Sequence, residues 1–119
     1  RVMNRYPVFV PLIMFGCGGV FVEVFRDVAF RLAPLRRNSV RSMIHEIKGI
    51  KLLEGFRGRP PADLDVLETY LIALSDLAMN HPEIDEMDIN PLMVHPQAQG
   101  ATVADCRMIL KAGGKNASE

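Results

Sequence analysis

Three apolar segments follow one another closely at the start of the chain, at residues 8–15, 20–25 and 28–35. Residues 16–19, three of them glycine, link the first two segments, and a short charged pair links the last two. A parallel strand pair needs a crossover of about a dozen residues or more, so links this short predict antiparallel neighbours in one sheet.

Two helices are predicted after these segments. Apolar residues recur at helical spacing after residue 38, which predicts a helix with Asn38 or Ser39 as its N-cap and Gly49 as its end. A second apolar stripe predicts a helix from about Asp63 to Asn80, just before a proline that cannot continue it.

The remaining segments, residues 86–94 and 101–110, predict a β-hairpin. The whole pattern contains no repeats and predicts an α+β fold, a mostly antiparallel sheet covered by two helices. A chain of 119 residues has the length of one small domain, which we expect to span residues 1–111. The small and polar residues 112–119 predict a disordered tail.

The composition excludes several classes of function. The 14 Lys and Arg residues balance 14 Asp and Glu residues, which leaves no excess positive charge for binding nucleic acid or an anionic membrane. The apolar run at residues 8–25 contains Pro11, glycines and Glu23, which argue against a membrane-spanning helix. Cys17 and Cys106 match no paired metal or disulfide spacing, so we expect a reduced, cytoplasmic protein.

The predicted hairpin carries the most informative polar residues. Asp88 and Asn90 are two positions apart, so their side chains share one face of a strand. If Val94 lies opposite Ala101, then Asn90 lies opposite Asp105, and polar residues face polar ones throughout. Directly opposed side chains have Cβ atoms about 5 Å apart. Asn90 and Asp105 could thus offer oxygen atoms to one Mg²⁺ ion, which needs few protein ligands when phosphate and water complete its shell.

Other interpretations of these residues remain open from the spacing alone. The hairpin could be a polar, solvent-facing element in which Asp88 and Arg107 form a weak ion pair. Gly18 and Gly19 belong to a turn that could approach a phosphate, although short glycine turns are common without a ligand. Glu23 could pair with an arginine on the neighbouring strand or add a second acidic group near the cation.

Five motifs occur in order along the chain. They are Met-Phe-Gly-Cys-Gly-Gly-Val-Phe-Val-Glu-Val at 14–24, Asp-Val-Ala-Phe-Arg-Leu-Ala-Pro-Leu at 27–35, Leu-Glu-Gly-Phe-Arg-Gly-Arg-Pro-Pro-Ala-Asp at 53–63, Glu-Met-Asp-Ile-Asn-Pro-Leu at 86–92 and Ala-Asp-Cys-Arg at 104–107. The ordered set resembles the ATP-grasp domain of the NDP-forming acyl-CoA synthetases, which include ADP-forming acetyl-CoA synthetases and relatives of the succinyl-CoA synthetase beta subunit. The likeness covers the C-terminal, metal-binding subdomain of that domain.

The resemblance implies roles for individual residues. Asn90 and Asp105 would be the Mg²⁺ ligands, in agreement with the hairpin argument. Asp88 would be a catalytic residue, because it occupies the family's acidic position beside the docking site of a phosphohistidine. The segment near the nucleotide, ATP or ADP, would contribute Gly18, Gly19 and Glu23.

By similarity, the reaction is acyl-CoA + ADP + phosphate ⇌ carboxylic acid + CoA + ATP, through an acyl phosphate and a phosphohistidine. The ATP-grasp domain exchanges the phosphoryl group between that histidine and ADP with the help of Mg²⁺. The family's N-terminal ATP-grasp half, its CoA-binding domains and its phosphohistidine domain have no counterpart in this sequence. We therefore expect those parts to be partners of this chain, and no turnover by this chain alone.

Two other functions fit the same sequence. The chain could be a non-catalytic α+β association module that forms a homodimer through an exposed strand edge at residues 8–15. It could also be the ATP-grasp-like domain of an acetyltransferase fusion, as in some relatives. Mg²⁺-dependent nucleotide binding at Asp88, Asn90 and Asp105 would separate the enzyme from the association module. The acyl group and the choice between ADP and GDP stay open.

Overall fold

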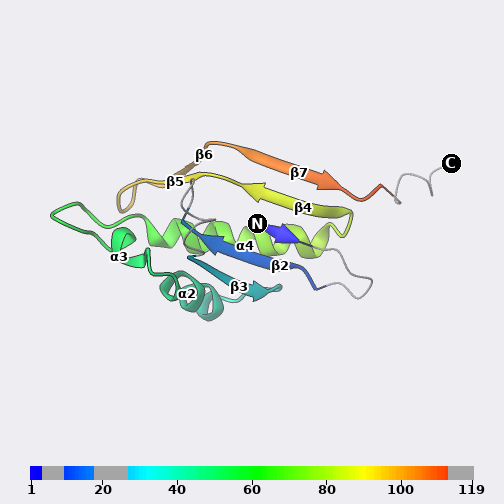
Figure 1. The fold of residues 1–119 in the computed structure, drawn as a ribbon, viewed down its shortest axis with the longest axis horizontal. Coiled ribbons are helices and arrows are strands. Elements are labelled where there is room, and N and C mark those ends of the chain that lie inside the picture. Colours follow the sequence, from blue (N-terminus) through cyan, green and yellow to red (C-terminus); the bar gives the residue numbers. More distant parts are fainter. Residues whose placement is uncertain (4–9, 18–26, 113–119) are drawn as a thin grey trace.

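The computed structural model describes residues 1–3, 10–17 and 27–112. Within these ranges, an antiparallel sheet packs against helices on one face (Figure 1). The α+β fold expected from the sequence is therefore confirmed. The five-stranded sheet has the order β3-β2-β1-β4-β7, and its strands are β1 (Val2–Met3), β2 (Leu12–Gly16), β3 (Val28–Leu32), β4 (Ile84–Ile89) and β7 (Cys106–Leu110).

The strand β1 lies in the centre of the sheet although it is the shortest strand. Val2 pairs with Ile13 of β2 on one side and with Met87 of β4 on the other, both antiparallel. The predicted exposed edge at residues 8–15 is wrong for residues 12–14, because they pair with β3 on one side and with residues 1–3 on the other. The edge strands of this sheet are β3 and β7.

A two-stranded sheet extends the C-terminal hairpin. It consists of β5 (Leu92–Val94) and β6 (Ala101–Val103), which pair antiparallel with Val94 opposite Ala101. The predicted hairpin is thus two short ladders that follow one another, β4 with β7 and β5 with β6. The predicted strand at residues 20–25 lies outside the described residues. The predicted tail at residues 112–119 also lies outside them, except for residue 112.

The first helix, α2 (Arg37–Glu46), differs from the prediction at both ends. Its N-cap is Arg36, whose backbone is extended and whose carbonyl accepts the N–H of Val40. The prediction of Asn38 or Ser39 as N-cap was wrong, because both residues already lie inside the first turn and no side chain caps the helix.

The C-terminal end of α2 also differs from the prediction. The helix ends at Glu46, before Gly49, and a short helix α3 (Ile50–Leu53) follows. Buried Val40, Met43 and Ile44 hold α2 in place, so packing outweighs capping preference here.

The long helix α4 (Leu64–Asn80) agrees with the prediction. Asp63 is its N-cap, and one carboxylate oxygen accepts the N–H of Val66 at 3.1 Å. The buried side of α4 includes two polar side chains that the apolar stripe did not reveal, Glu68 and Ser75. Glu68 is bound by Arg37 and Arg41 of α2, and so its buried charge is compensated.

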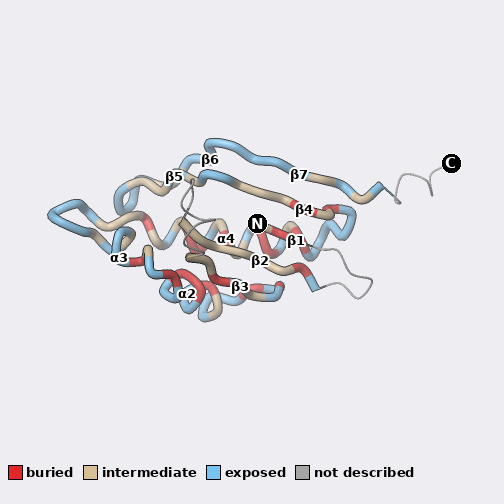
Figure 2. The backbone as a smooth tube through the Cα atoms, in the orientation of Figure 1, coloured by how far each residue is buried: buried red, intermediate tan, exposed pale blue. Residues whose placement is uncertain are grey.

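The hydrophobic core lies between α2, α4 and the face of the sheet that they cover (Figure 2). Val2 and Ile13 point into this core from the sheet, and Val40 and Met43 point into it from α2. Because alternate residues of a strand point to opposite faces, the residues between them point to the other face, which we call the open face. No helix among the described residues has the length and apolarity needed to cross a bilayer.

Candidate functional site

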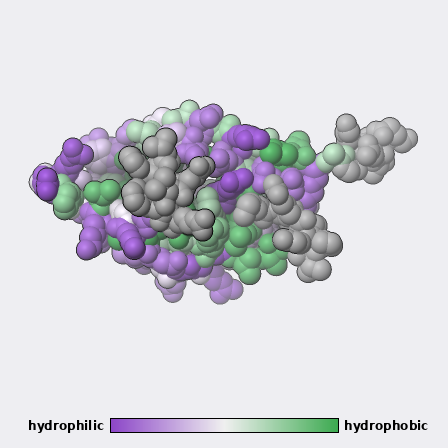
Figure 3. All heavy atoms as spheres, in the orientation of Figure 1, coloured by the Kyte–Doolittle hydropathy of each residue, from purple (hydrophilic) through white to green (hydrophobic). Residues whose placement is uncertain are grey.

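The open face of the sheet is divided into an apolar and a polar part. Phe30 and Leu32 of β3 stand on it and are 44% and 61% exposed. Figure 3 shows hydrophobic residues gathered over the β2–β3 side of the molecule and hydrophilic residues over much of the rest. On β4, Met87 pairs with buried Val2 and points toward the helices, so its neighbour Asp88 points to the open face.

The hairpin has the register that the sequence predicts. Asp88 pairs with Arg107 and Ile89 pairs with Cys106 across β4 and β7. The backbone N–H of Asn90 donates a hydrogen bond of 3.0 Å to the carbonyl oxygen of Asp105, which places these two residues opposite each other. The proximity of Asn90 and Asp105 expected from the sequence is therefore confirmed at the level of the backbone.

Asn90 and Asp105 lie where both strands of the hairpin are interrupted. β4 ends at Ile89 and β7 begins at Cys106, and the peptide bond between Asn90 and Pro91 is cis. Both Asn90 and Asp105 are exposed, and neither side chain makes a hydrogen bond to another described residue. Their oxygen atoms are thus available to a ligand.

The donor atoms at this position fit a magnesium ion. An amide oxygen and a carboxylate are hard oxygen ligands, and Mg²⁺ commonly takes one or two protein ligands together with water and phosphate oxygens. Among the described residues, no group of three or more His, Cys, Asp or Glu side chains could hold a metal ion. A closed, all-protein metal site is therefore not formed by this part of the chain, whereas a site shared with nucleotide phosphates is compatible with Asn90 and Asp105.

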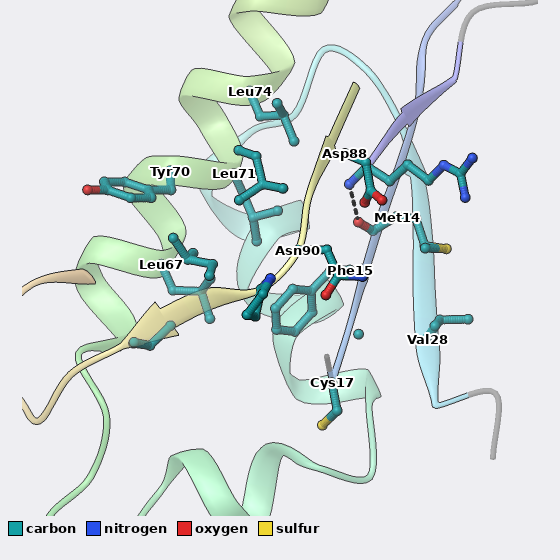
Figure 4. Close-up of a pocket in the computed structure, with 16 residues that line it drawn as sticks. Met14, Phe15, Cys17, Val28, Leu67, Tyr70, Leu71, Leu74, Asp88 and Asn90 are labelled. Carbon is teal, nitrogen blue, oxygen red and sulfur yellow. Dashed lines mark hydrogen bonds between the residues drawn. The ribbon is translucent and has the colours of Figure 1, made fainter. Parts of the chain in front are cut away.

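A cavity of about 160 Å³ opens beside these residues (Figure 4). Arg1 and Phe15 line one part of it, Asp88 and Asn90 another, and apolar side chains of α4 such as Leu71 form its base. The cavity could not be predicted from the sequence, because its walls come from separate parts of the chain: Arg1 and β2, α4, and residues 88–94.

The residue just before β3 is fixed to the loop between α2 and α3 by its carboxylate. Asp27 accepts the backbone N–H groups of Lys48 and Gly49 at 2.7 and 2.8 Å. The thiol of Cys17, which also lines the cavity, lies 3.9 Å from the same carboxylate. Burial raises the pKa of the Cys17 thiol, and the charge of Asp27 and their hydrogen bond act in the same direction. Cys17 is therefore a protonated packing residue near neutral pH.

The other predicted site residues, Gly18, Gly19 and Glu23, lie outside the described residues. Arg31, the arginine considered as a partner for Glu23, points to the helix side and contacts Glu46 of α2 at 2.8 Å. Asp88, Asn90 and Asp105 are thus the predicted site residues that the structure brings together.

This fold and this hairpin are those of a known domain class. Residues 2–110 match the family model described as "ATP-grasp domain", and the chain belongs to that family. The chain is 47% identical over 108 residues to ADP-forming acetate–CoA ligase I of Archaeoglobus fulgidus, a match that covers 91% of this chain and 16% of that protein. The beta subunit of ADP-forming acetate–CoA ligase I of Pyrococcus furiosus is 43% identical, with 91% of this chain and 46% of that subunit covered.

Solved structures show the same likeness. The dinucleotide-forming acetyl-coenzyme A synthetase 1 of Ca. Korarchaeum cryptofilum, in complex with coenzyme A and Mg-AMPPCP, superposes with a TM-score of 0.85 at 47% identity. The match covers 92% of this chain and 50% of that one, and the phosphohistidine segment of that structure points towards its nucleotide-binding site. The chain is thus homologous to ADP-forming acetate–CoA ligases and spans from about a sixth to a half of the length of these relatives.

Proposed function

We propose that this chain is the metal-binding portion of the ATP-grasp domain of an ADP-forming acyl-CoA synthetase, which transfers a phosphoryl group between a phosphohistidine and ADP. The observation that carries the proposal is the pairing of Asn90 with Asp105 at the interruption of the hairpin, with Asp88 on the open face beside them. Homology to acetate–CoA ligases that form ADP supports the reaction class.

Each residue has a defined part in this proposal. Asn90 and Asp105 hold Mg²⁺, which when bound offsets the negative charge on the nucleotide phosphates. Asp88 orients the incoming histidine, because a carboxylate on the open face can accept a hydrogen bond from one imidazole nitrogen and leave the other to carry the phosphoryl group. The nucleotide-binding segment contributes Gly18, Gly19 and Glu23.

The proposal includes partners, because a phosphoryl transfer of this kind needs groups that these residues do not supply. We propose that the other half of the ATP-grasp domain, the CoA-binding domains and the phosphohistidine domain complete the enzyme, and that this chain alone does not turn over substrate. The chain matches 50% of the Korarchaeum protein, whose structure holds both coenzyme A and Mg-AMPPCP. Cys17 and Cys106 are free thiols, which suits a reducing, cytoplasmic compartment.

Calorimetric titration of Mg²⁺ and ADP into the complete enzyme tests the metal assignment. We expect Asn90→Ala and Asp105→Ala each to weaken Mg²⁺-dependent ADP binding by about tenfold or more, since each removes one ligand oxygen. Asp76→Ala, at an exposed position of α4, is the matched control and should bind as the unaltered enzyme does. Unchanged binding in both hairpin variants would show that the hairpin is a structural element without a metal.

A further inference from the structure

Arg107 lies between the two parts of the proposed phosphoryl-transfer site. It pairs with Asp88 across the β4–β7 ladder, and it follows Asp105 by two positions along the chain. Figure 1 shows β4 and β7 side by side along one edge of the sheet. Opposed residues of a ladder share a face, and two residues of extended chain span about 7 Å. The guanidinium of Arg107 can therefore reach ligands bound beside Asp88 and ligands bound beside Asp105.

The side chain of Arg107 is free to bind a ligand. It is exposed, and it makes no hydrogen bond or ion pair with the described part of the chain. The opposed Asp88 forms no ion pair with it, although the register allows one. The buried carboxylate of Glu86, which lines the same small hollow, is bound by Arg1 at 3.3 Å. Arg107 thus presents its donors to the open face without an acceptor among the described residues.

The step that the proposed function requires creates a need for a cation at this place. A phosphoryl group passes from a histidine beside Asp88 to ADP that is held with Mg²⁺ at Asn90 and Asp105. In transit it resembles metaphosphate, and its negative charge is spread over three oxygen atoms. Mg²⁺ compensates the charge on the nucleotide side, whereas the histidine side holds the negative carboxylate of Asp88. A cation between the two sides lowers the barrier, because it attracts the charge where it develops.

An arginine has the right donor geometry for this task. Its planar guanidinium has five N–H donors in a fixed fork and stays protonated at physiological pH. Two of these N–H groups can donate parallel hydrogen bonds to two phosphoryl oxygens at once. The alternative role, an exposed ion pair with Asp88, would contribute little to stability, and the structure does not form it.

We propose that Arg107 is a catalytic residue that binds the phosphoryl group during its transfer between the phosphohistidine and ADP, a role that rests on the proposed function. The bond between phosphorus and the imidazole nitrogen breaks, and its electron pair stays on that nitrogen. An oxygen atom of the terminal phosphate of ADP supplies the pair for the new bond to phosphorus, which gives ATP. Arg107 donates hydrogen bonds throughout and neither gains nor loses a proton.

Substitutions of Arg107 in the complete enzyme test this role. Arg107→Met removes the charge and keeps much of the length of the side chain, whereas Arg107→Lys keeps the charge without the fork. We expect phosphorylation of the histidine by Mg-ATP in a single turnover to slow about a hundredfold or more in Arg107→Met and about tenfold in Arg107→Lys. Mg²⁺-dependent ADP binding should stay within about threefold of the unaltered enzyme in both variants.

Two controls separate this role from a structural one. Arg59→Met removes another exposed arginine, from the loop before α4, and should leave the transfer rate unchanged. In Arg107→Ala, added guanidinium ion at a concentration that leaves the enzyme folded should restore part of the transfer rate, because it refills the vacated position. Sodium chloride at the same ionic strength should not restore it. A structural defect would not respond to a small planar cation of this kind.

Three results would overturn the proposal. The first is an unchanged transfer rate in Arg107→Met, with ADP binding also unchanged. The second is an equal loss of ADP binding and of transfer, which would assign Arg107 to the nucleotide instead. The third is an Arg107→Ala enzyme whose slow transfer is not restored by guanidinium, which would assign Arg107 to the fold. A failure of the proposed function is a different result, because it appears as unchanged ADP binding in Asn90→Ala and Asp105→Ala.

Discussion

Asp88 lies directly opposite Arg107 in the β4–β7 pair, and both side chains stand on the open face of the sheet. Their neighbours along the strands, Ile89 and Cys106, alternate to the other face. Arg1 and Glu86 line the same small hollow as this pair. The carboxylate of Asp88 therefore lies on the open face beside Arg107, next to the residues proposed to hold Mg²⁺.

Replacing Asp88 by asparagine in the complete enzyme should separate catalysis from nucleotide binding. Asp88→Asn keeps the size of the side chain but loses the charge that would orient the phosphohistidine. We expect phosphorylation of the histidine by ATP to slow by about a hundredfold or more, the usual scale for removal of a catalytic group. Mg²⁺-dependent ADP binding should stay within about threefold of the unaltered enzyme, because Asp88 is not a proposed ligand.

The control for this experiment is Asp76→Asn, which removes an exposed carboxylate from α4. It should affect neither the transfer nor the binding. Equal losses in binding and transfer for Asp88→Asn would instead assign Asp88 to the metal or the nucleotide. Full phosphorylation of the histidine by the Asp88→Asn enzyme would show that Asp88 has no catalytic role.

Ser75→Ala should destabilise the fold more than a typical exposed substitution. Ser75 is completely buried, and its hydroxyl oxygen accepts the N–H of Leu35 at 2.8 Å, which ties the segment between β3 and α2 to α4. Alanine leaves that buried N–H without a partner, at a cost of about 1–3 kcal/mol in the free energy of unfolding. Urea denaturation measures the loss. Ser42→Ala, at an exposed serine that binds Arg31, should cost less than about 0.5 kcal/mol.

Asp63→Ala should loosen the loop of the C-terminal hairpin as well as the start of α4. One carboxylate oxygen of Asp63 accepts the N–H of Val66, and the other accepts the N–H of Gly100 at 2.9 Å. We expect a loss of about 1–2 kcal/mol from the cap, together with faster amide exchange at Gly100. Asp76→Ala should show neither effect. A loss of stability with unchanged exchange at Gly100 would confine the role of Asp63 to the helix.

Much of the fold could be predicted where the determinants are local. The register of the hairpin follows from the alternation around Asp88 and Asn90, because a slip of one residue would turn every side chain to the wrong face. The long helix α4 could be predicted from its apolar stripe and from Asp63, which has the usual chemistry of an N-cap.

The rest depends on contacts between distant parts of the chain. β1 has two residues, Val2 and Met3, too few for any periodicity, and its place in the sheet is set by pairing with residues more than 80 positions away. The start of α2 at Arg37 shows that burial can override a preferred cap. For the site, the sequence predicted the pair Asn90 and Asp105, but the cavity beside it forms only where Arg1 and α4 come together.

Gly49→Ala tests the close packing between the end of β2 and the loop before α3. A Cβ atom at Gly49 would overlap the Sγ atom of Cys17 and lie 3.2 Å from a carboxylate oxygen of Asp27. We expect a loss of about 1–3 kcal/mol, the usual cost of overpacking. In a double-mutant cycle, Cys17→Ala should remove most of that loss, because it clears the space that the new methyl group needs. Additive losses in the double variant would locate the cost in the backbone instead.

The reactivity of Cys17 should depend on pH in a direction set by its surroundings. Burial, with a smaller effect of Asp27, raises the pKa of the Cys17 thiol, so the folded chain holds this proton more tightly than the unfolded chain does. The contribution of this proton to the free energy of unfolding is fully present below the pKa of an unfolded cysteine, about 8.5, and is lost as pH rises above that value.

Alkylation by iodoacetamide, measured in a Cys106→Ser background, should therefore reach half of its maximal rate at higher pH in the folded chain than in urea. Asp27→Asn should move the folded profile toward lower pH, because it removes the negative charge beside the thiol. Coinciding profiles in folded and unfolded chain would mean that Cys17 is solvent-accessible and does not pack against the loop.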